Sequence, residues 1–188
     1  AFAEIIGTLV DYDAARDDNN VNRDSDGYEF RLGARIDLTG LIFGDVYAGY
    51  INRDYESSSL RSVEEVTAGV DLTWNVTPLT SLIGTVRREI SETTLASASG
   101  NLQTSASARV DHELLRSLIL SGQLGVSTDE FEGTSREDDY IRGMLQARYL
   151  LNRNFQFTVR YEYTDRDSSA AASDYDRNIF FLRLRAQL

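Results

Sequence analysis

The sequence predicts an all-β fold, an antiparallel up-and-down transmembrane β-barrel of about ten strands. Apolar and polar residues alternate with a period of two along most of the chain, and the connections between the alternating segments are in turn long and short. Aromatic residues also gather near the ends of these segments. The three patterns together are typical of a barrel in which each strand gives every second residue to lipid.

Composition restricts the possible classes of protein. The 188 residues are 41% hydrophobic and 26% charged, and no apolar run approaches the roughly 20 residues that a membrane-spanning helix needs. The single Pro and the 13 Gly suit a chain of strands, and we expect one domain over residues 1–188. A formal net charge of −11 argues against a nucleic-acid partner, because such binding depends on neutralising phosphates.

The order of strands and connections is clear from residue 28 onward. Residues 2–12 are apolar enough for a strand, but Ile5-Ile6 and Leu9-Val10 interrupt the alternation, so its two faces stay unassigned. Alternation predicts further strands at residues 28–38, 42–55, 66–76, 79–90, 102–114, 118–128, 141–151, 155–163 and 178–188. Residues 11–27, 56–65, 91–101, 129–139 and 164–177 are long polar loops, whereas residues 39–40, 77–78, 115–117 and 152–154 are tight turns. All tight turns therefore fall on one side of the membrane, together with Leu188.

Strand length and aromatic positions agree with a membrane span. About eleven residues at about 3.3 Å each, tilted by about 40°, rise roughly 27 Å, close to the thickness of a hydrocarbon core. Aromatic residues near the loop ends and the turn ends of the strands predict two interfacial belts. The first belt comprises Tyr28, Tyr50, Tyr140 and Tyr163, and the second comprises Trp74 and Phe155.

The alternation assigns side chains to two faces. The predicted lipid-facing residues are Phe30, Leu32, Ile36, Val70, Leu72, Trp74, Leu120, Leu124, Phe157, Val159, Phe180, Leu182 and Leu184. The predicted lumen-lining residues are Glu29, Arg31, Arg35, Asp37, Asp45, Asp71, Arg87, Glu89, Arg109, Asp111, Arg142, Arg148, Arg160, Glu162, Arg183 and Arg185. Charges of both signs in similar numbers predict ion pairs across the lumen.

The state of the lumen depends on the number of strands. In a closed barrel of about ten strands the charged side chains would fill the narrow interior, and in one of about sixteen or more they would line a channel. The strand after residues 178–188 would be either residues 2–12 or a strand upstream of Ala1. All 19 cationic residues are Arg, whose rigid guanidinium suits pairing with carboxylates, although a GC-rich codon preference would give the same composition.

A soluble barrel resembling the lipocalins is the main alternative fold. Its apolar faces would point inward and its charged faces would meet water, and alternation alone fits this arrangement equally well. Neither the regular exchange of long and short connections nor the aromatic strand ends are required of a soluble barrel, so both favour the membrane.

The sequence offers no catalytic or metal-binding constellation. The single histidine, His112, shares the apolar face with Val110 and Leu114, where a Ser-His-acid arrangement would not reach the lumen. Residues 17–27 are rich in Asp and Asn but lack the bidentate Glu of a calcium loop, so a solvated acidic loop is favoured. We therefore predict no enzyme, no cofactor and no metal site.

Several segments carry a family resemblance. They are residues 37–40, 74–80, 110–114, 135–139, 147–154 and 174–178, with the sequences DLTG, WNVTPLT, VDHEL, SREDD, ARYLLNRN and DYDRN. In these segments the chain resembles the putative beta-barrel porin 2 family of Gram-negative outer-membrane proteins. The resemblance implies a barrel often linked with exopolysaccharide export. Family members are usually about twice this long and commonly end on Phe instead of Leu188, so the chain resembles their C-terminal half.

These observations predict a non-enzymatic barrel in the outer membrane of a Gram-negative bacterium. Its function would be that of a passive pore or export component for polysaccharide or other solutes. The expected partners are outer-membrane lipid, lipopolysaccharide, and polysaccharide or its export machinery. The alternative is a plugged barrel that serves as a structural anchor or binds partners through its acidic external loops.

Overall fold

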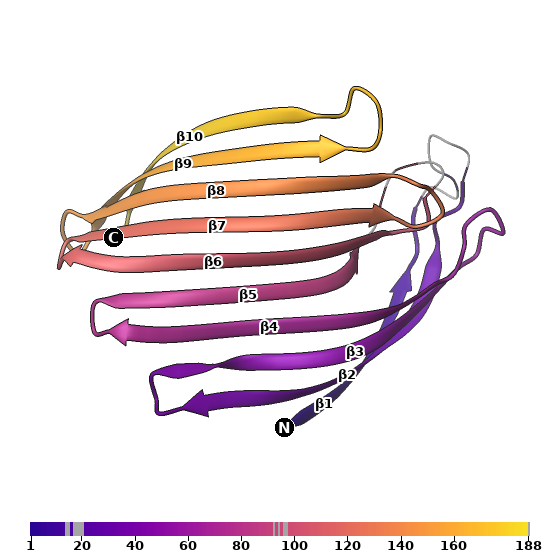
Figure 1. The fold of residues 1–188 in the computed structure, drawn as a ribbon, viewed down its shortest axis with the longest axis horizontal. Coiled ribbons are helices and arrows are strands. Elements are labelled where there is room, and N and C mark those ends of the chain that lie inside the picture. Colours follow the sequence, from indigo (N-terminus) through magenta and orange to yellow (C-terminus); the bar gives the residue numbers. More distant parts are fainter. Residues whose placement is uncertain (14–15, 17–20, 92, 94, 96–97, 188) are drawn as a thin grey trace.

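The protein is one curved antiparallel sheet of ten strands. The computed structural model describes residues 1–13, 16, 21–91, 93, 95 and 98–187. Each strand is hydrogen-bonded to the next one in chain order, from β1 to β10 (Figure 1). The predicted all-β, up-and-down fold is therefore confirmed. The described residues include no helix of the length and apolarity that a membrane crossing requires.

The strands follow the predicted order. They are β1 (Phe2–Val10), β2 (Ser25–Leu38), β3 (Ile42–Tyr55), β4 (Val63–Thr77), β5 (Thr80–Ser91), β6 (Asn101–Leu115), β7 (Leu118–Phe131), β8 (Glu137–Leu150), β9 (Phe155–Ser168) and β10 (Tyr175–Ala186). The tight turns lie at one end of the sheet and the longer connections at the other (Figure 1). We call these the turn end and the loop end.

Most strands are longer than the alternation of apolar residues predicts. The strand β9 continues past Tyr163 to Ser168, and β7 continues to Phe131. The loops predicted at residues 129–139 and 164–177 are correspondingly shorter. Pairing continues because the ladder of backbone hydrogen bonds does not need apolar side chains. The strands therefore extend beyond the apolar band at the loop end.

Two turns show how sequence fixes the hairpins. Thr39 and Gly40 both have positive φ, 61° and 66°, in the three-residue connection between the paired Leu38 and Ile42. The Asp37 side chain accepts a hydrogen bond of 3.2 Å from the Gly40 N–H. At the β8–β9 turn the Asn152 side chain accepts backbone N–H bonds from Asn154 and Phe155, at 2.8 and 2.9 Å. These side chains replace missing backbone partners and set the register of the hairpins.

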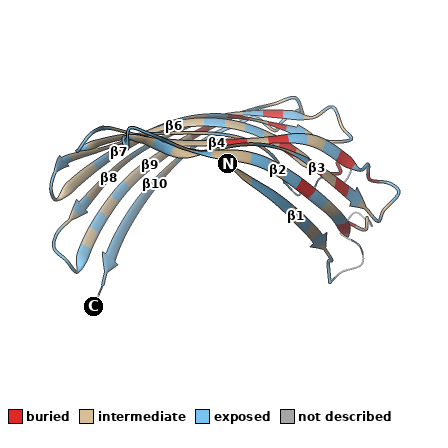
Figure 2. Cartoon of the chain, turned by 90° about the horizontal axis from the view of Figure 1, so that it is seen from below, coloured by how far each residue is buried: buried red, intermediate tan, exposed pale blue. Residues whose placement is uncertain are grey.

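The sheet forms an open arch (Figure 2). Within the described residues β1 and β10 each pair with one neighbour and not with each other. A closed barrel of these ten strands is therefore not what the structure shows. The register is strongly staggered, because the row of directly opposed residues that begins at Ile36 near the turn end of β2 reaches Asn178 near the loop end of β10. Such stagger accompanies the tilt of strands in a barrel wall.

The register also divides the side chains between two faces, since directly opposed residues point to the same side. One face holds buried polar residues such as Thr67, Ser127 and Asp138. On the other face, side chains such as Leu124 and Leu182 are 72% and 74% exposed. Curvature brings side chains together on the inside and separates them on the outside. The polar face is therefore concave and the apolar face convex.

The convex face carries a continuous apolar band of about five or six alternate residues in each long strand. The band in β4, for example, runs from Trp74 and Val76 at the turn end to Val66. All residues predicted to face lipid lie on this face. A polar row that includes Asp26, Glu64, Arg88, Asp139 and Asp165 closes the band at the loop end. The register also resolves β1, where Ile5 opposes Phe30 on the convex face and Ile6 opposes Glu29 on the concave one.

Tyrosines lie where the apolar band ends, on the side of the loop end. The Tyr50 hydroxyl donates to Glu64 at 3.0 Å, that of Tyr161 to Asn178 at 2.6 Å and that of Tyr163 to Asp165 at 3.4 Å. Each ring lies within the apolar band while its hydroxyl reaches the polar row, which is the usual arrangement of an interfacial tyrosine.

The prediction for Tyr140 in the same belt is wrong. Tyr140 immediately precedes Ile141 of the convex band, so period two places it on the concave face. The Arg142 guanidinium lies 4.3 Å from the centre of its ring. A position near a strand end is therefore not enough to assign an aromatic residue to the belt. The residue must also point to the same face of the sheet as the apolar residues of its strand.

A small apolar core lies where two strands separate. Pairing of β4 with β5 ends at Ala68 and Arg88, although β4 continues to Val63 and β5 to Ser91. The buried residues of this core are Ile51, Leu60, Val63, Ala98 and Leu102. The β5–β6 connection is fastened there by the Arg23 guanidinium, which donates to the Ala98 carbonyl at 3.3 Å. This core covers the concave face of β3 and β4 at the loop end, where buried residues gather in Figure 2.

A charge in the convex band tests the assignment of faces. We expect Leu124→Arg to lower the free energy of unfolding in lipid vesicles by about 2–4 kcal/mol, because the guanidinium would enter hydrocarbon. The matched control is Gln123→Arg, which adds the same charge at the same depth on the concave face and should cost less than about 1 kcal/mol. Urea titrations followed through the fluorescence of the single tryptophan, Trp74, measure both. Equal losses would refute the assignment.

Candidate lumen surface

The concave face brings together the charged residues that the sequence assigned to a lumen. Every one of these predicted lumen-lining positions lies on this face by register. The structure thus places the whole set on one continuous surface of the sheet. Whether that surface borders water in a pore remains a prediction.

Ion pairs of two geometries hold the charged side chains. Along single strands, residues two apart pair: Arg31 with Glu29 at 2.6 Å, Arg109 with Asp111 at 2.9 Å and Arg160 with Glu162 at 3.2 Å. Between neighbouring strands, Arg35 pairs with Asp45 at 3.0 Å and Arg87 with Asp71 at 2.5 Å. Opposite charges therefore pair locally, and no ion pair of the described residues crosses from one side of the arch to the other. The predicted pairing across a lumen stays a prediction.

Glycine and tyrosine shape the surface around the first of these pairs. The Tyr47 ring lies over Gly69, where an added Cβ would come within 2.0 Å of the ring. The Arg31 guanidinium lies 4.9 Å from the centre of the same ring. Glu29 also accepts a hydrogen bond of 2.7 Å from the Thr67 hydroxyl. Together these contacts hold the Arg31 guanidinium beside β3.

Charge is unevenly distributed around the arch. On β1–β4, which we call the acidic wall, the concave carboxylates are Glu4, Glu29, Asp37, Asp45, Glu65 and Asp71, against Arg31, Arg35 and Arg53. On β8–β10, which we call the basic wall, the concave guanidiniums are Arg142, Arg148, Arg160, Arg166, Arg177, Arg183 and Arg185, against Asp138 and Glu162. The face is therefore divided by sign.

Sequence reasoning treated the charges as balanced and missed this division. It also left Arg166 and Arg177 in a loop, because the apolar band ends before them. The signal that would have found them is parity: both continue the odd or even series of the inward residues on their strands. Strand extension past the band, which the structure reveals, brings them onto the wall.

Aromatic rings and hydroxyls orient the guanidiniums of the basic wall. Arg160 lies 4.6 Å from the centre of the Phe181 ring, and Arg142 donates a hydrogen bond of 2.6 Å to Ser127. No carboxylate of the described residues forms an ion pair with Arg142, Arg148, Arg177, Arg183 or Arg185. The wall therefore has positive charge without a matching negative charge on its own surface.

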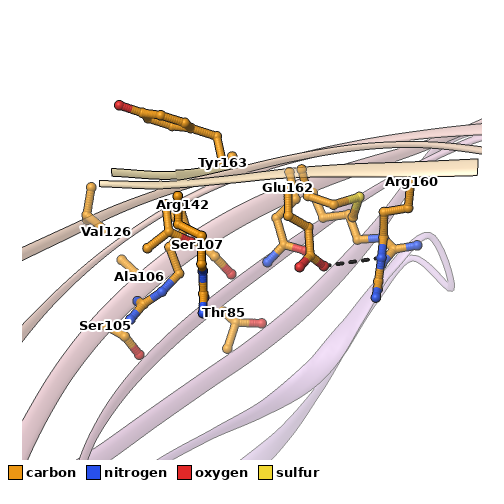
Figure 3. A pocket seen from close by; sticks show the side chains of 16 residues that line it. Thr85, Ser105, Ala106, Ser107, Val126, Arg142, Arg160, Glu162 and Tyr163 are labelled. Atoms are coloured by element: carbon orange, nitrogen blue, oxygen red, sulfur yellow. Dashed lines mark ion pairs between the residues drawn. The ribbon is translucent and has the colours of Figure 1, made fainter. Parts of the chain in front are cut away.

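A depression of about 370 Å³ lies between β6 and β10 on this face (Figure 3). Its floor is small and polar, with Ser105 and Ser107, and its sides are formed by larger groups that include Arg142 and Arg160. In Figure 3 these side chains and Glu162 point to the same side of the sheet, whereas Tyr163 points to the other. The volume suits a group the size of a sugar unit.

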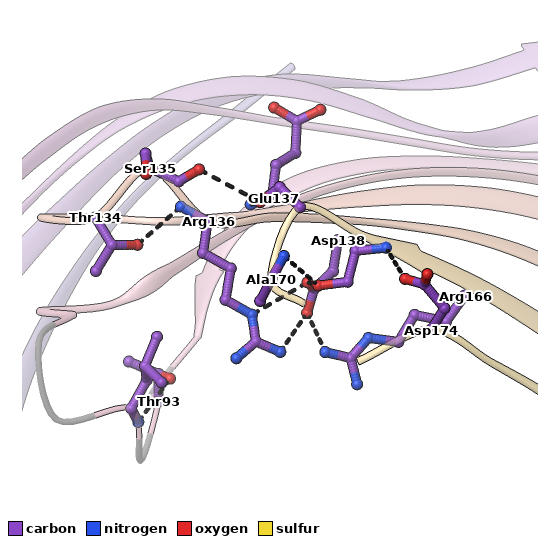
Figure 4. A network of polar contacts seen from close by, with 12 residues as sticks. Thr93, Thr134, Ser135, Arg136, Glu137, Asp138, Arg166, Ala170 and Asp174 are labelled. Carbon is purple, nitrogen blue, oxygen red and sulfur yellow. Dashed lines mark hydrogen bonds and ion pairs between the residues drawn. The ribbon is translucent and has the colours of Figure 1, made fainter. Parts of the chain in front are cut away.

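A buried carboxylate anchors the loop end of the basic wall (Figure 4). Asp138 is 1% exposed and accepts hydrogen bonds from Arg136 at 3.0 and 3.1 Å, from Arg166 at 2.6 Å and from the Ser168 hydroxyl. Burial alone would raise the pKa of Asp138, but the bonds from Arg136 and Ser168 and the positive charge of Arg166 outweigh burial and lower it. Asp138 thus joins the β7–β8 connection to β9.

The structure assigns ordinary contacts to the residues considered for catalysis or metal binding. The His112 ring lies on the convex face and bonds to the Thr80 hydroxyl at 2.9 Å. In the candidate calcium loop, residues 17–20 lie outside the described residues, and Asp24 accepts the Tyr12 N–H at 2.9 Å. Among the described side chains, no group of three or more His, Cys, Asp or Glu residues is arranged to hold a metal ion.

The comparison with protein families identifies the chain. A family model described as "Putative beta-barrel porin 2" matches residues 1–188, and the chain belongs to this family. A comparison with curated proteins gave no significant match. The staggered up-and-down sheet, with one apolar and one charged face, is consistent with the barrel that the family description names.

Removing the buried carboxylate tests the anchor. We expect Asp138→Asn to destabilise the folded protein by about 3 kcal/mol, because two guanidiniums lose their partner in a buried place. The adjacent Asp139→Asn is the control, since Asp139 is exposed and its loss should cost within about 0.5–1 kcal/mol. Urea unfolding of both variants in the same detergent provides the measurement. Similar stability of the two variants would contradict the assigned role.

The lowered pKa of Asp138 sets the sign of a pH effect. A carboxylate with a folded pKa below its unfolded value stabilises fully above the unfolded pKa, about 4, and the stabilisation is lost as pH falls through the folded pKa. The stability difference between wild type and Asp138→Asn should therefore be constant from about pH 7 to about pH 5 and shrink below about pH 4. A difference that grows on acidification would contradict this account.

Proposed function

We propose that this porin-family chain forms the wall of a water-filled pore in the outer membrane of a Gram-negative bacterium, through which hydrophilic solutes or polysaccharide pass. The observation that carries the proposal is the division of one continuous sheet into an apolar convex face and a charged concave face. Lipid would contact the convex band, and water would contact the concave walls. The outer membrane is the location that such barrels occupy in Gram-negative bacteria.

The charged face supports a hydrated interior. Isolated charges in a dry environment are very unfavourable, and several guanidiniums of the basic wall have no carboxylate partner on it. The Arg35 side chain on the acidic wall is 80% exposed even though it is paired. Side chains of this kind are stable where water reaches them, as it does in the lumen of a pore.

A passive role follows from the kind of groups present. The concave face offers guanidiniums, carboxylates, hydroxyls and amides, which bind and steer polar solutes. The chain belongs to a family of porin-like barrels, which supports a non-enzymatic function. Polysaccharide is the proposed cargo because guanidinium, amide and hydroxyl groups match sugar hydroxyl and carboxylate groups, and because the wall continues along the full length of the strands.

A plugged barrel is the second candidate function. The observation in its favour is the core at the loop end, where residues of the β5–β6 connection cover part of β3 and β4. The Ser99 N–H donates to the Glu132 carbonyl at 2.9 Å, which fastens this connection to the β7–β8 connection. A barrel closed at its mouth in this way would serve as an anchor or a surface-binding protein.

Conductance distinguishes the two functions. Purified protein inserted into planar lipid bilayers should give stable, ohmic single-channel currents if the concave face lines an open pore. The fold of the same preparation is checked by its strand signal in circular dichroism and by Trp74 fluorescence. Absence of current from protein that passes these checks would reject the pore and favour the plugged barrel.

A further inference from the structure

We infer that the basic wall binds an anionic polymer, specifically a polysaccharide that carries carboxylate groups. The inference rests on the proposed pore, since it names the chemical class of the molecule that would pass along the wall. Neither family membership nor the alternation of residues distinguishes a neutral from an acidic sugar. The distribution and pairing of the arginines do.

The arginines form a ladder along the strands. Arg148 and Arg183 lie on either side of Thr158 in one row of opposed residues, and Arg142 and Arg177 lie on either side of Thr164 in another. Arginines of one row are two strands apart, about 10 Å. Each row therefore presents two guanidiniums around a central hydroxyl.

The ladder extends over the height of the wall. The row of Arg160 lies between these two rows, and that of Arg185 lies toward the turn end. The row of Arg166, whose guanidinium pairs with the buried Asp138, lies toward the loop end. Neighbouring rows on one face are about 7 Å apart, and the row of Glu162, which contains no arginine, separates the row of Arg160 from that of Arg142. The five arginine rows therefore cover about 34 Å along the strands. A small anion would use one row only. A polymer with repeated negative charges would contact several rows at once, and its weak contacts would add along the chain.

The chemistry of the ladder favours carboxylates on sugars. Guanidiniums bind carboxylates through two parallel hydrogen bonds. The Arg142 guanidinium is held against the Tyr140 ring and pairs with no carboxylate of the described residues, whereas Arg160, held against the Phe181 ring, also pairs with Glu162. The depression between these arginines is lined by Gln123, Ser105 and Ser107, which can bond sugar hydroxyls. A hydrated sugar unit with a carboxylate fits this combination of groups.

Only the basic wall offers an anionic polymer a surface that is both open and attractive, because the acidic wall differs from it in cover and in charge. The loop-end core covers the concave face of β3 and β4, and the acidic wall would repel an anionic polymer. The basic wall carries no comparable cover among the described residues, and its depression is open to the concave side (Figure 3). An anionic chain would therefore be held against β8–β10 and kept away from β1–β4.

Oligosaccharides of equal length and different charge test the inference. Titration calorimetry on detergent-solubilised protein at low salt should show binding of hexameric oligogalacturonate and none of maltohexaose. The binding should weaken steeply with added salt, because the contacts are ionic and hydrated. The double variant Arg142→Gln with Arg177→Gln should reduce affinity about tenfold or more, which corresponds to about 1.4 kcal/mol.

Two further variants control for the position of the removed charge and for folding. Arg35→Gln removes one guanidinium from the acidic wall, and we expect it to leave the affinity for oligogalacturonate within about twofold of wild type. Arg148→Gln with Arg183→Gln removes a second row of the ladder and should lower affinity to a similar degree as the first double variant. Trp74 fluorescence confirms that each variant is folded.

The outcomes separate the inference from the proposed pore. Equal binding of both oligosaccharides, unchanged binding by the double variants, or an equal loss in Arg35→Gln would overturn the basic wall as the site. Binding of purified lipopolysaccharide in place of oligogalacturonate would identify lipid phosphate as the ligand and also overturn it. Ohmic current without oligogalacturonate binding would leave the pore standing and reject the inference, whereas binding without current would support the site and reject passage.

Discussion

Period-two alternation in a fully hydrogen-bonded sheet is the constraint on which the rest of the structure depends. Each strand must satisfy its backbone groups with its neighbours, so its side chains can only point to two sides. In this protein one side receives Leu, Val, Phe and Tyr, and the other receives Arg, Asp, Glu and Ser. The curvature of the sheet then gives the two sets different environments, because a concave face gathers its side chains while a convex face spreads them. Fold and surface chemistry have a single origin.

Charge adds a second level of organisation that alternation does not explain. Ion pairs within a strand or between neighbours would satisfy a structural need at any point of the sheet, as Arg109 with Asp111 does. Yet the carboxylates concentrate on β1–β4 and the guanidiniums on β8–β10, and several of the latter have no carboxylate on their wall. A passage between these walls would have a transverse electric field, which orients and selects charged solutes. In the proposed pore, this division of charge would favour anionic solutes along β8–β10.

The sequence predicted strand order, turn positions and faces because period two is a local signal that needs no knowledge of neighbours. It failed where the outcome depends on pairing. Ile5-Ile6 obscured β1 until the register placed Ile5 beside Phe30, and Tyr140 was assigned by its place near a strand end instead of its parity. The alternation predicts a loop at Arg177, because backbone pairing of β9 with β10 continues beyond the apolar residues of both strands. The charge division, and the core around Leu102, depend on which strands lie side by side, which alternation alone does not encode.

The account's central claim is that one side of a strand meets lipid and the other meets water, and spin labels along β7 test it most directly. The chain has no cysteine, so each position from Leu118 to Phe131 can carry a single introduced thiol and one label. In protein folded into vesicles, we predict collision with oxygen to be highest at the even positions of the apolar band, such as Leu120 and Leu124. Collision with a water-soluble nickel complex should be highest at odd positions such as Gln123. Equal accessibility of neighbouring positions to both reagents, or the opposite phase, would contradict the account.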